Sequence, residues 1–487
     1  MGNFKNSLLS GMKWTTLSAI VKSVVKLLQV AILTRFLPKS DFGTIAIATL
    51  FISFTELFLD MGISSAIMHR QDTTKEEYSS LFWLNILTGI ILTGILWIVS
   101  PFIAQYYNDE SLTIILRMLS LNVLFSSIGR QHITIRHKNL DFKFLANVEL
   151  ATYFGTFVIA VLLAYIGLGV FSLVYSTLFA ISFPNIINCI YGIHKDGNIH
   201  FHFKIKETYP YLKIGIYKIG SLIIDFFCRE FDVVIISTTL GKETLGMYSL
   251  CKKIVQMMYN LVNPILTKVL TPMFAKIQND KIRLKTNYLR IVNILATTNH
   301  PLYILIAVLS TSILNTLYGP TYIEGQYVLS LLAVSYGLMS ICNPVGTLQV
   351  ALGRTDIGFY WTIFRIITNT LFIYVGALFS INGLAAAILL YNLFVIFPFW
   401  YMQYRPMLHI SFGEYLKSNI YQFIIAVICA APFVVLLYSN TNILISIFIG
   451  IIYISLYTYI MNIVDKDNDI ISLVQSYIKT KFRAINK

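Results

Sequence analysis

Fourteen long apolar runs dominate this sequence, and they restrict the chain to folds that cross a membrane. The chain has 487 residues, of which 56% are apolar and only 12% are charged, and its mean hydropathy is +0.70. About 20 apolar residues in a helix span the hydrocarbon layer of a bilayer, and a soluble core cannot hide this much apolar surface. The runs cover about residues 13–37, 41–65, 81–106, 111–135, 144–166, 168–193, 210–240, 243–273, 288–318, 322–352, 356–380, 381–404, 415–438 and 442–463. We therefore predict an all-α integral membrane protein with about 14 transmembrane helices; the alternative is twelve spans plus two re-entrant pieces.

A polar stripe inside the first run recurs in the seventh run, 203 positions later. Its members fall at helical spacing, so they share one face of a helix. The two copies are Thr15, Ser18, Lys22, Lys26 and Gln29, and then Lys218, Ser221, Asp225, Arg229 and Asp232. The match continues through the loops Leu37–Gly43 and Leu240–Gly246. The sequence thus predicts two six-helix repeats of the parallel type, because an even number of spans brings both repeats in from the same side.

This offset divides the chain into five predicted parts. An N-terminal six-helix repeat covers residues 1–193, a polar and basic cytoplasmic linker covers 194–210, and a C-terminal six-helix repeat covers 211–405. Two extra transmembrane helices follow at 406–463. Residues 464–487 form a basic amphipathic tail that we expect to lie on the inner leaflet, with a frayed, solvated tail as the alternative.

The net charge of +14 is spread unevenly over the predicted loops. Basic residues gather in every second loop, for example Arg136 and Lys138 or Lys204 and Lys206, whereas the loops between them hold only Lys39 and Lys242. The positive-inside rule then predicts that both termini are cytoplasmic. The positive charge indicates topology and attraction to anionic lipid headgroups, so no nucleic-acid partner is predicted.

Motifs for catalysis or cofactor binding are missing from this sequence. The five cysteines have neither paired nor metal-type spacing, and His200-Phe-His-Phe203 has no carboxylate or thiolate nearby to complete a metal site. Gly241-Lys-Glu-Thr lacks the residue order of a phosphate loop. We predict no enzyme activity, no cofactor and no metal; a glycan polymerase or ligase would need a larger outer loop than any found here.

Several charged residues fall inside predicted spans, where each costs about 2.5–3.5 kcal/mol unless it finds a partner, water or a ligand. Lys22, Lys26, Arg229 and Arg365 are fixed cations, and such a set in a low-dielectric cleft suits a multiply charged anion such as a diphosphate. The alternative is structural pairing, for example of Lys22 with Asp225.

The acidic residues inside spans have two possible roles. Glu56, Asp60, Asp225 and Asp232, together with Glu149, are able in principle to exchange H⁺ or hold Na⁺ and so couple transport to an ion gradient. The alternative, which we favour, is that they balance the buried bases.

Short motifs along most of the chain resemble those of one superfamily of exporters. Leu33-Thr-Arg-Phe-Leu-Pro-Lys-Ser-Asp-Phe-Gly43 and Asp60-Met-Gly62 resemble the opening of Wzx-type polysaccharide flippases in the multidrug/oligosaccharidyl-lipid/polysaccharide exporter superfamily. So do Arg229-Glu-Phe-Asp232, Leu240-Gly, Leu245-Gly-Met-Tyr248, Pro272 and Gln278-Asn-Asp280. The likeness is closest to the colanic-acid-exporter branch.

This resemblance implies two six-helix bundles in a V shape and alternating access in a bacterial inner membrane. It also implies a substrate, a polyprenyl-diphosphate-linked glycan that is turned from the inner to the outer leaflet for cell-surface polysaccharide biosynthesis, with glycan polymerase machinery as a candidate partner. The alternative is an ion-coupled lipid II or multidrug exporter of the same superfamily. The cationic stripe of the first span argues against the multidrug branch, which usually relies on acidic residues.

Overall fold

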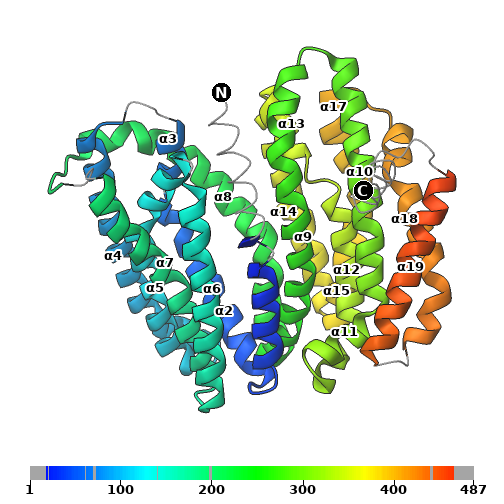
Figure 1. The fold of residues 1–487 in the computed structure, drawn as a ribbon, viewed down its shortest axis with the longest axis horizontal. Helices are drawn as coiled ribbons and strands as arrows, with labels where there is room; N and C mark the ends of the chain where they lie inside the picture. Colours follow the sequence, from blue (N-terminus) through cyan, green and yellow to red (C-terminus); the bar gives the residue numbers. More distant parts are fainter. Residues whose placement is uncertain are drawn as a thin grey trace, which may run out of the picture. The chain divides into compact units, whose positions relative to one another are not determined.

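The computed structural model describes residues 18–19, 21–60, 62–69, 73–139, 141–196, 200–438 and 442–464. Within these ranges the chain is helical and contains no β-strand (Figure 1). This agrees with the predicted fold class, because backbone groups in hydrocarbon must bond within their own helix. The predicted amphipathic tail lies outside the described residues.

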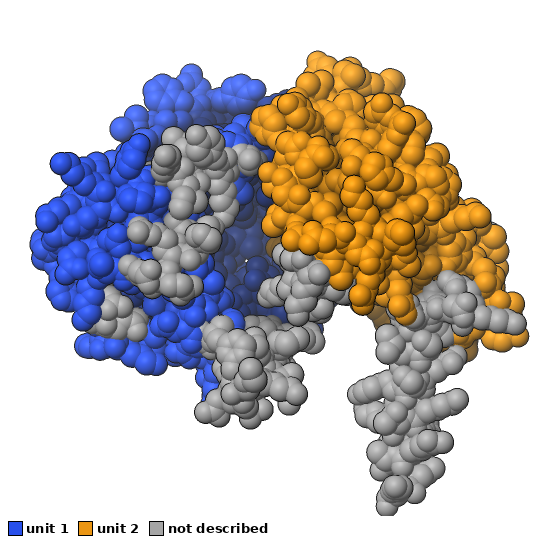
Figure 2. All heavy atoms as spheres, turned by 90° about the horizontal axis from the view of Figure 1, so that it is seen from above, with its two compact units in different colours: residues 1–249 blue, residues 250–487 orange. Residues whose placement is uncertain are grey.

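The chain divides into two compact units, residues 1–249 and 250–487 (Figure 2). Unit 1 contains, besides a first helix at residues 21–33, the helices α2 (Lys39–Asp60), α3 (Ile63–His69), α4 (Lys75–Tyr106), α5 (Ser111–Lys138), α6 (Phe142–Tyr165), α7 (Val170–Asp196) and α8 (Ile205–Thr239). Helix α5 is central to this unit, since it packs against α2, α4 and α7. Helix α9 (Gly241–Ile277) begins in unit 1 and continues into unit 2.

Unit 2 is built around α10 and α12. Helix α10 packs against α12 and α18, and α15 packs against both α12 and α14. The helices of this unit after α9 are α10 (Lys281–Val308), α11 (Ser310–Leu317), η1 (Pro320–Gly325), α12 (Gln326–Ser340), α13 (Val345–Leu352), α14 (Thr355–Ala377), α15 (Ile381–Phe394), α16 (Ile396–Phe399), η2 (Trp400–Tyr404), α17 (Arg405–Leu408), α18 (Phe412–Tyr438) and α19 (Ile443–Val464).

Large apolar side chains lie on the outside of the helices, and several polar side chains are buried among them. Asn122, Gln131 and His132 on α5 are each only 1% exposed, whereas Ile98 on α4 is 70% exposed and Leu444 on α19 is 73% exposed. Large apolar side chains on the outside of a helical bundle are stable when hydrocarbon surrounds them. The distribution therefore supports a multi-pass membrane protein.

Ten described helical segments are long and apolar enough to span a membrane. The predicted runs not among them are the first helix, part of which lies outside the described residues, together with α8, α9 and α14. These four carry Lys22, Arg229, Lys252 and Arg365 respectively, and such charges lower the mean hydropathy of a helix. The total of 14 spans, the two repeats and the domain boundaries remain predictions.

Several predicted runs are interrupted in the structure. The run at 41–65 becomes α2 and α3, which meet at Gly62, where φ is +73° and a side chain would be strained. The run at 322–352 is interrupted between α12 and α13, with Pro344 at the start of α13. Helix α8 begins at Ile205, inside the predicted linker, so the linker's non-helical described part is only His200–Lys204.

Candidate functional site

The polar stripe of the first helix faces α6. Lys22 is half-buried, and its Nζ lies 5.4 Å from the centre of the Tyr153 ring, to which it is also hydrogen-bonded. Ser18 donates a hydrogen bond of 2.5 Å to Glu149, one turn before Tyr153 on α6. An ammonium group is attracted to the face of an aromatic ring. Tyr153 was not predicted as a site residue, and its sequence signal is the i, i+4 spacing from Glu149 on an apolar helix.

Arg229 and Asp225 form an ion pair within α8. Arg229 Nη2 lies 2.8 Å from Asp225 Oδ2, at the i, i+4 spacing that favours such pairs on a helix. The Arg229 side chain is 62% exposed and that of Asp225 is 39% exposed. The pair is therefore open to a ligand. The sequence had suggested Lys22, not Arg229, as the structural partner of Asp225.

The other two predicted cations lie on different helices. Lys26 is exposed on the first helix, one turn beyond Lys22. Arg365 is half-buried on α14 in unit 2, where its backbone carbonyl accepts a hydrogen bond of 3.4 Å from Tyr391 on α15. Diphosphate binding by Lys22, Lys26, Arg229 and Arg365 stays a prediction.

The predicted acidic residues of unit 1 each bond to the protein. Glu56 interacts electrostatically with Arg130 on α5. Asp60 accepts hydrogen bonds from the backbone amide and the hydroxyl of Ser64 at the start of α3. Asp232 is 6% exposed and accepts a hydrogen bond from the Tyr248 hydroxyl on α9. Whether these residues couple transport to an ion gradient or balance the buried bases stays a prediction.

An unpredicted polar junction lies in the loop between α4 and α5. The carboxylate of Asp109 bonds to Lys242 Nζ at 2.8 Å and accepts a hydrogen bond of 3.2 Å from Thr44. Burial would raise the pKa of Asp109, but its hydrogen bonds from Lys242, Ser111 and Thr44 outweigh this and hold that pKa below its ordinary value. The carboxylate therefore stays ionised at neutral pH and ties α2 to the start of α9.

Two glycines let the starts of α2 and α9 touch at this junction. A Cβ on Gly43 would overlap the carbonyl oxygen of Lys242, and a Cβ on Gly246 would overlap the carbonyl oxygen of Lys39. Both the glycines and the lysines are separated by 203 positions, so the contact is reciprocal. The matching loops noted in the sequence contained this signal, although the sequence alone did not show that they meet.

The predicted absence of a carboxylate near His200-Phe-His-Phe203 is wrong. His202 Nε2 lies 3.0 Å from Glu207 Oε1, which is in the first turn of α8. Within the part of the chain that the structure describes, no group of three His, Cys, Asp or Glu residues is positioned to hold a metal ion.

Comparison with known proteins identifies the family of this chain. Residues 32–327 match the family model described as polysaccharide biosynthesis protein. The chain belongs to that family. Its relatives include the teichuronic acid biosynthesis protein TuaB of Bacillus subtilis, which is 28% identical over 74% of each chain. The lipopolysaccharide biosynthesis protein WzxC of Escherichia coli is 24% identical over 85% of each chain.

Solved structures with the same fold are membrane transporters. The structure titled lipid II flippase MurJ, inward closed conformation, matches with a TM-score of 0.73 and 14% sequence identity, covering 93% of this chain and 99% of that one. An inward-facing multidrug resistance MATE transporter matches with a TM-score of 0.61 and 16% identity, covering 80% of this chain and 98% of that one. At these identities the likeness shows the fold alone.

Proposed function

We propose that this protein flips a polyprenyl-diphosphate-linked oligosaccharide from the cytoplasmic to the outer leaflet for cell-surface polysaccharide biosynthesis. Family membership carries this proposal, since the relatives are named for biosynthesis of teichuronic acid and of lipopolysaccharide. The exporter-type fold supports it. The cationic groups inside helices suit the diphosphate that such a substrate carries.

Arg229 is the group that we assign first to the diphosphate. Its guanidinium is paired with Asp225 yet 62% exposed, so a phosphate oxygen can approach without any helix having to unfold. A guanidinium binds phosphate through two parallel hydrogen bonds. In the resting protein Asp225 neutralises the cation, and the diphosphate takes over that role when it binds.

Lys22 is the second assigned group, and Tyr153 positions it. The ring contact and the hydrogen bond hold the ammonium against α6, which limits the conformational entropy that a long side chain loses on binding. Lys26 follows one turn later on the first helix. Arg365 of unit 2 remains the fourth predicted ligand, and H⁺ or Na⁺ coupling through Glu56, Asp60, Asp225 or Asp232 remains a prediction.

The experiment is flipping in liposomes. Purified protein is reconstituted with a labelled polyprenyl-diphosphate oligosaccharide, and exposure of the inner pool to an added glycosidase is followed with and without a pH or Na⁺ gradient. Protein-dependent exposure is expected. No exposure with several glycans and folded protein would overturn the proposal and favour a lipid II or multidrug exporter.

Arg229→Ala tests the site assignment in the same assay. Loss of one charged hydrogen-bonding group costs about 1.5–3 kcal/mol, so flipping at low substrate concentration should fall by roughly 10- to 100-fold. The matched control is Arg354→Ala, which removes an arginine whose ion pair with Asp356, at 3.0 Å, is also local and exposed. Equal flipping by the two variants at equal abundance would contradict the assignment.

A further inference from the structure

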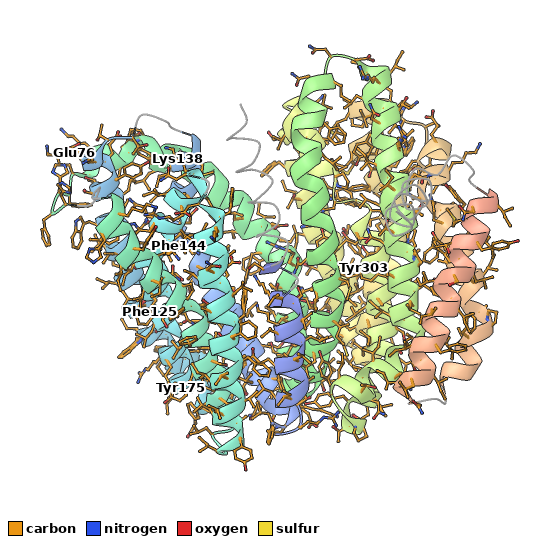
Figure 3. The ribbon with its side chains drawn as sticks, viewed as in Figure 1. Glu76, Phe125, Lys138, Phe144, Tyr175 and Tyr303 are labelled. Carbon is orange, nitrogen blue, oxygen red and sulfur yellow. The ribbon has the colours of Figure 1, made fainter. Side chains whose placement is uncertain are left out.

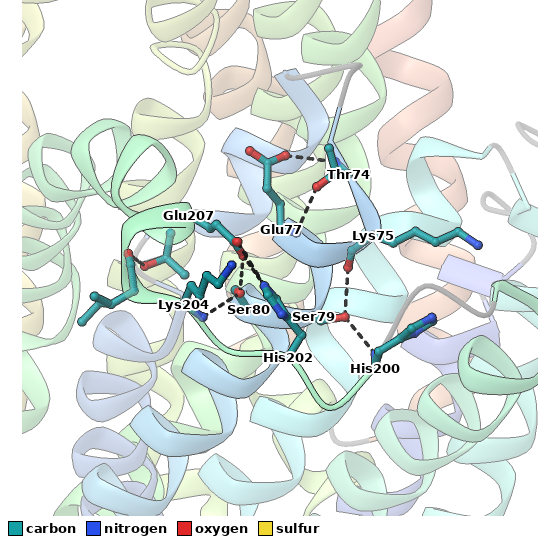
Figure 4. Close-up of polar contacts among 11 residues, drawn as sticks. Thr74, Lys75, Glu77, Ser79, Ser80, His200, His202, Lys204 and Glu207 are labelled. Carbon is teal, nitrogen blue, oxygen red and sulfur yellow. Dashed lines mark hydrogen bonds and ion pairs between the residues drawn. The ribbon is translucent and has the colours of Figure 1, made fainter.

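The segment at residues 200–210, called here the linker segment, has one polar face that is bound to α4. Ser79 Oγ accepts a hydrogen bond of 2.8 Å from the backbone amide of His200, and Ser80 Oγ accepts one of 3.0 Å from the amide of Lys204 (Figure 4). Ser80 in turn donates to Glu207 at 2.6 Å. Both serines are fully buried. Two amides of a non-helical stretch are thus satisfied by protein rather than by water.

The start of α8 reinforces this attachment. Glu207 also bonds to His202 at 3.0 Å, so its carboxylate is hydrogen-bonded within the segment. Hydrogen bonds from Ser80 and His202 hold the pKa of Glu207 below its ordinary value. Just beyond the segment, the fully buried Tyr211 donates a hydrogen bond of 3.1 Å to Glu77 on α4. The linker segment is therefore a fixed part of unit 1.

The opposite face of the linker segment is apolar and cationic. Phe201 is 96% exposed, and Ile205 and Tyr209, one helical turn apart, are each 66% exposed. Lys204 and Lys206 are exposed between them. Exposure of these apolar side chains to water is unfavourable, whereas aromatic and basic side chains together are typical of a segment that lies at a membrane surface.

Trp83 and the length of α4 place this face at the level of the lipid headgroups. Helix α4 has 32 residues, about 48 Å at the helical rise, which exceeds the ~30 Å hydrocarbon layer. Its first turn carries Lys75, Glu76 and Glu77, so the excess length extends into the interface at this end. There Trp83 donates a hydrogen bond of 3.1 Å to the carbonyl of His200, and its ring contacts that of Phe201 in a tilted arrangement, with 4.8 Å between the ring centres. Tryptophan is enriched at that depth.

The same end of unit 1 carries further lysines. Glu76 near the start of α4 and Lys138 at the end of α5 lie at one end of the unit, and Tyr175 near the start of α7 lies towards the other (Figure 3). Lys138 lies 3.4 Å from the Tyr78 hydroxyl, and Lys195 near the end of α7 has a side chain that is 53% exposed. Each Lys or Arg near an anionic membrane surface contributes attraction.

We propose that the linker segment docks on anionic phospholipid headgroups and anchors the start of α8 in the membrane interface. Phe201, Ile205 and Tyr209 enter the interface, and Lys204 and Lys206 bind lipid phosphates. Since α8 also carries Asp225, Arg229 and Asp232, lipid binding would fix the helix that bears the predicted substrate groups. The anchoring does not depend on which substrate the protein carries.

A spin label at Phe201 tests this proposal. Phe201→Cys is labelled with a nitroxide in full-length protein that has Cys228→Ser and Cys342→Ser, and its accessibility to oxygen and to an aqueous nickel complex is measured by EPR. Vesicles of phosphatidylcholine alone are compared with vesicles that also contain phosphatidylglycerol. Glu110→Cys, in an exposed loop between α4 and α5, is the water-exposed reference. We expect the Phe201 label to be oxygen-accessible and shielded from nickel, most strongly with phosphatidylglycerol.

Two charge variants separate lipid recognition from general effects of charge. Lys204→Glu with Lys206→Glu should reduce the extra shielding from nickel that phosphatidylglycerol gives the label by on the order of 10-fold. Lys281→Glu with Arg283→Glu makes the same change of charge at the exposed start of α10 and should leave the label unaffected. Nickel access equal to that of Glu110, or shielding that does not depend on phosphatidylglycerol, would overturn the proposal.

Discussion

A charged side chain inside a membrane protein needs a partner, and unit 1 provides partners of different kinds. Arg229 uses an acid one turn away on its own helix. Lys22 uses an aromatic ring on another helix, and Asp232 uses the hydroxyl of Tyr248. The first kind follows from local spacing. The other two depend on how helices pack, so they appear only in the folded chain.

Substitutions of Tyr153 should separate the ring contact from the hydrogen bond to Lys22. Tyr153→Phe keeps the ring but removes the hydrogen bond to Lys22, so it should slow flipping less than Tyr153→Ala, which removes both contacts. Tyr153→Ala removes a cation–π contact of about 0.5–2 kcal/mol and should slow flipping at low substrate concentration by roughly 2- to 30-fold. The liposome assay measures both variants. Equal losses in the two would show that the hydroxyl, not the ring, positions Lys22.

Asp109 should stabilise the protein at neutral and mildly acidic pH. Its pKa is lower in the folded protein than its ordinary value, so its contribution is complete above the unfolded pKa of about 3.9. The contribution is lost as the pH falls through the folded pKa. Asp109→Asn should therefore lower the free energy of unfolding by about 1–3 kcal/mol at pH 7 and pH 5, and by progressively less as the pH falls below the unfolded pKa of about 3.9.

Thermal unfolding in detergent at these pH values measures that effect. The control is Asp356→Asn, whose ion pair with Arg354 has both side chains about half exposed; it should change stability by less than about 1 kcal/mol. A difference between parent and Asp109→Asn that disappears already at pH 5 would contradict the low pKa of Asp109.

At the scale of elements, the sequence predicted the lengths of most helices and the charged residues that they carry. It predicted the breaks within helices and the contacts between helices only in part. The apolar runs predicted α5, α6 and α19 closely, because a backbone in hydrocarbon has to be helical. The breaks beside Gly62 and Pro344 fell inside runs that read as continuous. The close crossing of α2 and α9 required knowledge of which loops meet.

Alanine at Gly43 or Gly246, where α2 and α9 touch, should push the two helices apart. Gly43→Ala and Gly246→Ala each place a methyl group on a backbone carbonyl of the other helix start, and forced overpacking of this kind costs about 1–3 kcal/mol. The matched control is Gly94→Ala in α4, where a Cβ meets nothing within 4 Å. That control should be neutral or slightly stabilising, since alanine favours helix.

Unfolding temperature and the yield of monodisperse protein measure these three variants. If Gly43→Ala unfolds at the temperature of Gly94→Ala, the helix starts do not require this contact.

At the scale of the whole molecule, α18 and α19, the two helices predicted to lie beyond the repeats, are part of the core of unit 2. Ile304 of α10 lies in one buried cluster with Cys429 of α18 and Tyr453 of α19. Asn293 of α10 donates a hydrogen bond of 2.7 Å to Tyr421 of α18, and Tyr457 of α19 donates one of 3.3 Å to the carbonyl of Thr297. Helices α18 and α19 are therefore packed into unit 2 through α10.

Two tyrosines of α19 test this integration. Tyr453 is 2% exposed and Tyr459 is 66% exposed. Tyr453→Ala should lower the free energy of unfolding by about 3–5 kcal/mol, as for other large buried aromatic side chains, whereas Tyr459→Ala should change it by less than about 0.5 kcal/mol. Thermal unfolding in detergent gives the comparison. Similar values for the two variants would mean that α19 is not needed for the stability of unit 2.

The sequence by itself determined the helical membrane fold, the positions of most spans and the residue types inside them. These follow from local properties: an apolar run long enough to cross hydrocarbon must be helical, and helical spacing determines which residues share a face. It also led to the family, because the motifs that resemble polysaccharide flippases lie largely within the residues that match the family model.

Only the tertiary structure decided which partner a polar group takes on another helix or loop. It placed Lys22 against Tyr153, Asp109 against Lys242, and Glu207 against His202 and Ser80. Periodicity fixes the face on which a side chain lies but not the helix that packs there. That choice depends on the packing of many side chains at once, which no local pattern in the sequence records.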